Sequence, residues 1–118
     1  DYMKWIGHSE FGLDYKMIYS SNLRFPHDKE LNHWLEQWYL TYRHVLELSS
    51  KRSELFIIGY ESLCTNPKVW INIKNLLNIN PKTNFIFKES KKNTELVIDN
   101  ELLDKCNNLY ESLLSKSV

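Results

Sequence analysis

The longest regular pattern of apolar positions lies between Asp28 and Ser50. Apolar side chains recur there at spacings of three and four residues, typical of an amphipathic helix, at Leu31, Trp34, Leu35, Trp38, Tyr42, Val45 and Leu46. Asp28 is a suitable N-cap for this helix. Large aromatic side chains on such a stripe usually pack in a core. A base-stacking surface would need a basic surround, and only Arg43 and His44 could supply it, so we interpret the stripe as core.

A short apolar run, Leu55–Tyr60, follows this helix. Its length and the turn signals around it predict a strand that is buried on both faces, as in a parallel sheet. Ligands of open α/β sheets bind beyond the carboxyl ends of such strands, where Tyr60 and Glu61 stand. The chain offers few neighbouring strands, which indicates that it belongs to a larger α/β domain.

Two further helices are predicted after this strand. One runs from Pro67 to about Leu77, with Asn66 as its N-cap and Asn78 at its end. The other is capped by Asp99 and buries a stripe made of Leu102, Leu103, Cys106, Leu109, Tyr110 and Leu113.

The remaining segments carry weaker signals. Asp1–Ile6 has the pattern of a helix end closed by Gly7, and Asn84–Lys88 predicts a short extended piece. Repeats, low-complexity tracts and linkers are missing from the sequence, so residues 1–118 form one partial domain. The first residue is Asp1 rather than methionine, which favours a start within a longer protein.

Charge and composition exclude several classes of partner. Fifteen basic and fifteen acidic residues cancel, so no overall field favours nucleic acid or an anionic membrane. No segment approaches the roughly 18 apolar residues of a membrane span. Cys64 and Cys106 lack a Cys-x-x-Cys spacing, which predicts reduced thiols in a cytoplasmic protein. Positive charge gathers only between Lys82 and Lys92.

Motifs for metal, phosphate-loop or nucleophilic chemistry are missing from the sequence. The four histidines lack the one-turn spacing of shared metal ligands, so we expect no metal site. The three glycines form no phosphate-binding pattern. Cys106 falls on the apolar stripe of the last helix, and Cys64 is interpreted as a filler between strand and helix. Taken alone, the basic segment is either a solvated loop or a source of cationic donors for a phosphate.

Tyr60 and Glu61, the polar residues at the end of the predicted strand, need hydrogen-bond partners. A buried polar group without a hydrogen bond costs about 1–3 kcal/mol. We expect Glu61 to be structural, accepting backbone N–H bonds from the turn Ser62–Thr65. We expect Tyr60 to offer its ring and hydroxyl to a ligand.

The order of these pieces resembles the C-terminal half of the sulfotransferases, which transfer a sulfuryl group from 3′-phosphoadenosine 5′-phosphosulfate to a hydroxyl or amine. The matching segments are Trp34–Leu46, Leu55–Leu63, Asn66-Pro67, Ile73–Leu77, Phe87–Asn93 and Leu109–Leu113. The opening, residues 2–12, also resembles a segment of some bacterial-type members. The resemblance covers nearly all of the chain, and it is carried by the order and spacing of the motifs.

The resemblance implies a P-loop-like three-layer α/β domain. This chain would be its C-terminal portion, mostly helical with one buried core strand, and the phosphate-binding N-terminal part would be its missing partner. Tyr60 would lie near the adenine of the co-substrate, and the loop with Lys88, Ser90, Lys91 and Lys92 would close over the nucleotide without a metal. An aromatic face, a hydroxyl and lysine donors suit an adenine and an anionic group. The acceptor would be a small molecule or a glycan.

The sequence also departs from the family. It has no counterpart of the 5′-phosphosulfate loop or of the Arg and Ser pair that grips the 3′-phosphate, and no catalytic residue can be assigned. The isolated chain is expected to be inactive, because it lacks the groups that stabilise charge on the transferring group. The alternative hypothesis is a non-enzymatic helical module whose Trp/Tyr helix binds a groove on a protein partner.

Overall fold

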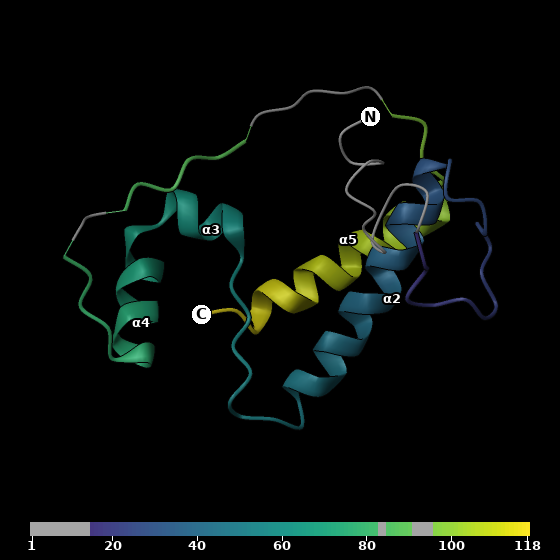
Figure 1. The fold of residues 1–118 in the computed structure, drawn as a ribbon. Helices are drawn as coiled ribbons and strands as arrows, with labels where there is room; N and C mark the ends of the chain where they lie inside the picture. Colours follow the sequence, from purple (N-terminus) through teal and green to yellow (C-terminus); the bar gives the residue numbers. More distant parts are fainter. Residues whose placement is uncertain (1–14, 83–84, 91–95) are drawn as a thin grey trace.

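The computed structural model describes residues 15–82, 85–90 and 96–118. These residues form four helices: α2 (Leu31–Ser49), α3 (Tyr60–Thr65), α4 (Pro67–Leu77) and α5 (Asn100–Ser115). Figure 1 shows α2 and α5 side by side, with α3 and α4 forming a separate lobe. The predicted helix end at Asp1–Ile6 lies outside the described residues.

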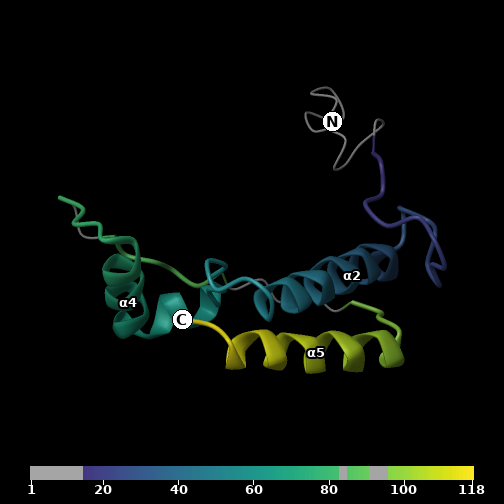
Figure 2. The same cartoon turned by 90° about the horizontal axis from the view of Figure 1, so that it is seen from below.

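Helices α2 and α5 run in the same direction. At their beginnings, the Asp99 backbone N–H donates to Asn32 Oδ1 at 2.9 Å. At their ends, Lys116 Nζ donates to Ser50 Oγ at 2.7 Å. The turned view in Figure 2 shows the same parallel course. Parallel neighbours need a long connection, and here residues 50–99 supply it, carrying α3 and α4 on the way.

Helix α5 contributes the apolar side of this pair. Its cap and stripe follow the sequence prediction: Asp99 Oδ1 accepts from the Leu102 backbone N–H at 2.9 Å. The buried apolar side chains of α5 recur at spacings of three and four residues, at Leu102, Cys106, Leu109 and Leu113. The Cys106 thiol donates to the Leu35 carbonyl across the interface at 3.8 Å, so its prediction as a core residue is confirmed.

Helix α2 differs from the prediction in its start and in its buried face. It begins at Leu31 with Glu30 in the cap position. Asp28 is not the cap, because it lies two residues before the cap position, where its backbone carbonyl accepts the Trp34 indole N–H at 2.8 Å. The aromatic stripe is only partly core, since Trp34 and Tyr42 are 38% and 40% exposed.

The fully or largely buried residues of α2 are polar: His33, Glu36 and Gln37. They hydrogen-bond the irregular segment 15–25 that covers this face of the helix. The Glu36 carboxylate accepts the backbone N–H groups of Arg24 and Phe25, each at 2.9 Å. Gln37 both donates to the Tyr19 carbonyl and accepts from the Tyr19 N–H. A segment without its own hydrogen-bond ladder must find partners elsewhere, and these side chains supply them.

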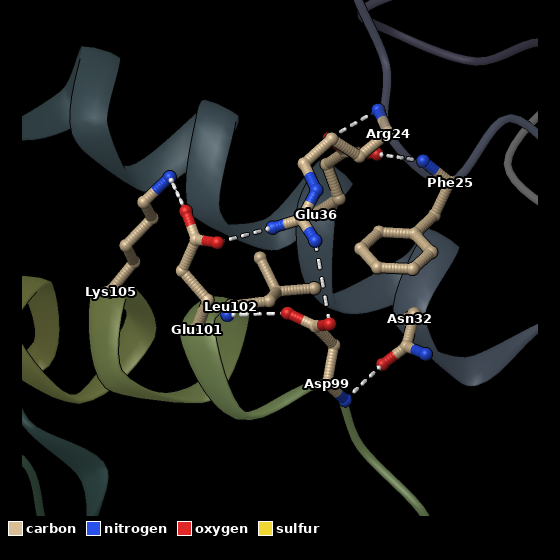
Figure 3. A network of polar contacts seen from close by, with 8 residues as sticks. All are labelled: Arg24, Phe25, Asn32, Glu36, Asp99, Glu101, Leu102 and Lys105. Carbon is tan, nitrogen blue, oxygen red and sulfur yellow. Dashed lines mark hydrogen bonds and ion pairs between the residues drawn. The ribbon is translucent and has the colours of Figure 1, made fainter.

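Arg24 connects the same segment to α5. Figure 3 shows its guanidinium between two carboxylates at the start of α5, at 3.4 Å from Asp99 and 3.2 Å from Glu101. Glu101 also pairs with Lys105 one turn further along the helix, at 3.0 Å. These ion pairs are exposed, so solvent screens them and each contributes little to stability.

The lobe formed by α3 and α4 has a smaller core. Asn66 caps α4 by accepting the Lys68 N–H at 3.1 Å, and Asn78 ends α4 in the left-handed conformation, so both predicted caps are confirmed. The buried residues of α4 are Val69 and Ile73.

The run Leu55–Tyr60 is not a buried strand within this chain. Phe56 and Ile58 are 47% and 45% exposed. Among the described residues its pairing is one parallel bridge between Ile57 and Ser117. Tyr60 already belongs to α3, so the strand prediction was too long at its carboxyl end. A strand buried on both faces requires neighbours that the described residues do not provide.

Candidate functional site

Tyr60 occupies the first turn of α3, directly after the buried Gly59. Its ring is 51% exposed, as expected for a ligand-facing residue. Its hydroxyl donates to the backbone carbonyl of Lys88 at 2.8 Å. The neighbouring Cys64 thiol raises the pKa of Tyr60 above its ordinary value.

The bond to Lys88 brings the basic segment to the start of α3. Residues 85–90 carry no regular secondary structure, and their aromatic side chains pack on α4: the rings of Phe85 and Phe87 lie 5.9 and 5.4 Å from that of Trp70. The Lys88 ammonium is not used in the bond to Tyr60, and the side chains of Lys88 and Ser90 are exposed.

The five predicted co-substrate residues are therefore only partly placed. Tyr60 and Lys88 come together although 28 positions separate them in sequence. Ser90 follows two residues later on the same exposed segment. Lys91 and Lys92 lie outside the described residues.

Glu61 is held by a side chain of α5 rather than by the predicted turn. Residues 62–65 are part of α3, so their N–H groups are directed along the helix. The Tyr110 hydroxyl donates to Glu61 Oε2 at 2.7 Å. This bond, followed by one from the backbone N–H of Glu61, lowers the pKa of Glu61, and it raises the pKa of Tyr110. Glu61 thus links α3 to α5.

A groove of about 330 Å³ lies beside this link, between α2, residues 56–61 and α5. Its walls are mainly apolar, with hydroxyls and one carboxylate at Tyr42, Tyr60, Glu61 and Tyr110. Gly59 lines it where the chain passes closest to α5: a Cβ at this position would lie 2.6 Å from Leu114 Cδ2. A larger residue here would displace the Leu114 side chain, and the chain continues from Gly59 to Tyr60 at the edge of the groove.

The buried His33 is the polar residue that sequence reasoning missed. Its Nδ1 lies 2.7 Å from the Phe25 carbonyl, which can only accept, so Nδ1 carries the hydrogen. Its Nε2 lies 2.7 Å from the Tyr15 hydroxyl. A usable signal existed: His33, Glu36 and Gln37 form a second stripe at helical spacing, next to a loop that needs hydrogen-bond partners. The arrangement ties the loop to α2.

Other chemistry is limited in the part of the chain that the structure describes. There, no group of three His, Cys, Asp or Glu side chains could hold a metal ion. Neither cysteine is in a disulfide, and Cys64 is half-buried beside Tyr60. Within the same residues, no helix is long and apolar enough to cross a membrane.

Comparisons of the chain with protein-family models, with curated proteins and with solved structures give no match.

Proposed function

We propose that this chain is the C-terminal part of a 3′-phosphoadenosine 5′-phosphosulfate-dependent sulfotransferase domain. The complete cytoplasmic enzyme moves the sulfuryl group from the phosphosulfate to an acceptor hydroxyl or amine. The sulfur–oxygen bond to the phosphate breaks, a bond from sulfur to the acceptor forms, and the acceptor loses its proton. The other half of the domain supplies the main phosphate contacts.

One observation carries this proposal: an exposed tyrosine ring is fastened to a segment with exposed cationic and hydroxyl side chains. Tyr60 presents its ring, and its hydroxyl holds the backbone of Lys88. The Lys88 ammonium and the Ser90 hydroxyl remain available to an anion. A ring face that stacks on a base, next to donors for a phosphate, is a suitable combination for an adenine nucleotide.

The test uses the longest expressed form of the protein that contains this chain. Isothermal titration with 3′-phosphoadenosine 5′-phosphate measures affinity, and transfer of labelled sulfate to phenol, sugar and amine acceptors measures activity. Loss of a stacking ring costs about 1–3 kcal/mol, so Tyr60→Ala should weaken nucleotide binding by roughly 5- to 150-fold. Tyr60→Phe, which keeps the ring, should retain most of the affinity.

Lysine variants test the basic segment. Lys88→Ala and the double variant Lys91→Ala/Lys92→Ala should lower the affinity, more strongly at low salt, because exposed charges are screened. Lys51→Ala removes an exposed lysine from the turn after α2 and is the matched control. Equal affinities in all these variants, or no binding by the parent protein, would reject the proposal in favour of the non-enzymatic interaction module.

The isolated 118-residue chain provides a second test. We expect it to bind the nucleotide weakly or not at all, because the sequence contains no phosphate loop. A dissociation constant for this chain in the low micromolar range or below would contradict that expectation.

A further inference from the structure

The segment 85–90 is fastened to the α3–α4 lobe at two places. The rings of Phe85 and Phe87 pack edge-to-face with the ring of Trp70 in α4, with interplanar angles of 87° and 65°. Edge-to-face contacts of this kind are favourable because the positive ring edge meets the negative ring face. The second fastening is the hydrogen bond from Tyr60 to the Lys88 carbonyl.

The aromatic contacts leave most of the segment exposed, since Phe87 is half-buried whereas Phe85 is 54% exposed. Phe85 and Phe87 are alternate residues, and both contact Trp70. The residue between them, Ile86, is 83% exposed. The contacts with Trp70 and the bond from Tyr60 therefore hold the segment against the α3–α4 lobe, while Lys88 stays exposed next to Tyr60.

We propose that Trp70 is a positioning residue, which holds residues 85–88 on the α3–α4 lobe so that Lys88 and Ser90 face the anionic part of the bound nucleotide. The identity of the ligand rests on the function proposed above. The positioning itself rests on the contacts of Trp70 alone.

Helix α4 is suited to a test of this role because its own packing uses other residues. Val69 and Ile73 are its buried side chains, whereas Trp70 is half-buried. Trp70→Ala should therefore leave α4 folded. Ile71→Ala, at an exposed position of the same helix, is the matched control, and Trp70→Phe preserves an aromatic ring as a rescue variant.

The first readout needs no ligand: the rate at which trypsin cleaves after Lys88, followed by mass spectrometry. Local release of a segment increases cleavage, so Trp70→Ala should raise this rate by roughly three- to tenfold. Ile71→Ala should leave it unchanged, and Trp70→Phe should bring it to within about twofold of the parent. An unchanged rate in Trp70→Ala would overturn the positioning role.

The second readout is the affinity for 3′-phosphoadenosine 5′-phosphate in the longest expressed form of the protein. We expect a roughly three- to tenfold loss in Trp70→Ala and no loss in Ile71→Ala. Faster cleavage with undiminished affinity would overturn the link between Trp70 and the nucleotide. If the parent protein does not bind the nucleotide, the proposed function fails, and the cleavage rate still decides whether Trp70 positions the segment.

Discussion

The α2–α5 pair and the α3–α4 lobe show how differently two parts of one chain can bury similar patterns. In the pair, hydrogen bonds join the two helices from their first residues to their last, and four apolar residues of α5 are buried. In the lobe, α4 buries two residues and leaves Ile71, Leu76 and Leu77 exposed. Both α4 and α5 are amphipathic, so the difference comes from the partners available to them. An apolar stripe predicts a helix, but it does not predict how completely the helix is covered.

The strongest test of this difference removes one leucine from each region. Leu109, on the buried face of α5, is 7% exposed, whereas Leu77, at the end of α4, is 56% exposed. Leu109→Ala should lower the free energy of unfolding by about 2–5 kcal/mol, because it leaves a cavity. Leu77→Ala should change it by about 0.5 kcal/mol or less. Urea unfolding followed by circular dichroism measures both, and similar losses would show that the lobe is as well packed as the pair.

The polar side of the pair can be tested at Glu36. Its carboxylate accepts two backbone N–H groups, whereas an amide has only one oxygen to offer. Glu36→Gln should therefore lower the free energy of unfolding by about 1.5–3 kcal/mol. Glu47→Gln, an exposed position on the same helix, is the control. If both variants unfold at the same urea concentration, the segment 15–25 is not held by Glu36.

The junction between the two regions can be opened at Gly59. A methyl group there would lie 2.6 Å from Leu114 Cδ2, so the Leu114 side chain must shift. Gly59→Ala should lower the free energy of unfolding by about 1 kcal/mol, the low end for overpacking, because the clashing atom ends a flexible side chain. Combining it with Leu114→Ala should recover part of this loss, because the clashing atom is then gone. A single variant as stable as the parent would show that the Leu114 side chain moves aside without cost.

The smallest expected effect concerns the link between Glu61 and Tyr110. Glu61 is exposed, so Glu61→Gln should lower the free energy of unfolding by less than about 1 kcal/mol. The loss should still exceed that in Tyr60→Phe, which removes only a neutral hydrogen bond. The pKa of Glu61 in the folded chain is below its ordinary value of 4.5. Its stabilisation is therefore complete above that pH and is lost as the pH falls through the lower, folded-state pKa. Thermal unfolding of Glu61→Gln and the parent between pH 3 and pH 7 should show their difference disappearing at the acid end. A larger loss in Tyr60→Phe would reverse the roles that we assign.

The sequence predicts the helices better than it predicts their surroundings. Caps and stripes are local, so α4 and α5 could be located from Asn66, Asn78 and Asp99. The buried face of α2 could not, because His33 and its neighbours are buried by a loop without periodicity. The exposure of Leu55–Ile58 depends on which strands lie beside it, and the sequence of this segment alone does not determine those neighbours. Tyr60 could be singled out from its place after an apolar run, but its bond to the Lys88 backbone depends on how the chain returns from α4.

The parallel course of α2 and α5 also has an electrostatic consequence. Each helix carries roughly half a positive charge at its first turn and half a negative charge at its last, and in a parallel pair the like ends meet. Asp99 and Glu101 place carboxylates at the shared positive end. Lys116 is the C-cap of α5, and its ammonium reaches the C-cap of α2, Ser50, so one cation serves both negative ends. The repulsion between the aligned dipoles is thereby countered at each end by the side chains that also join the helices.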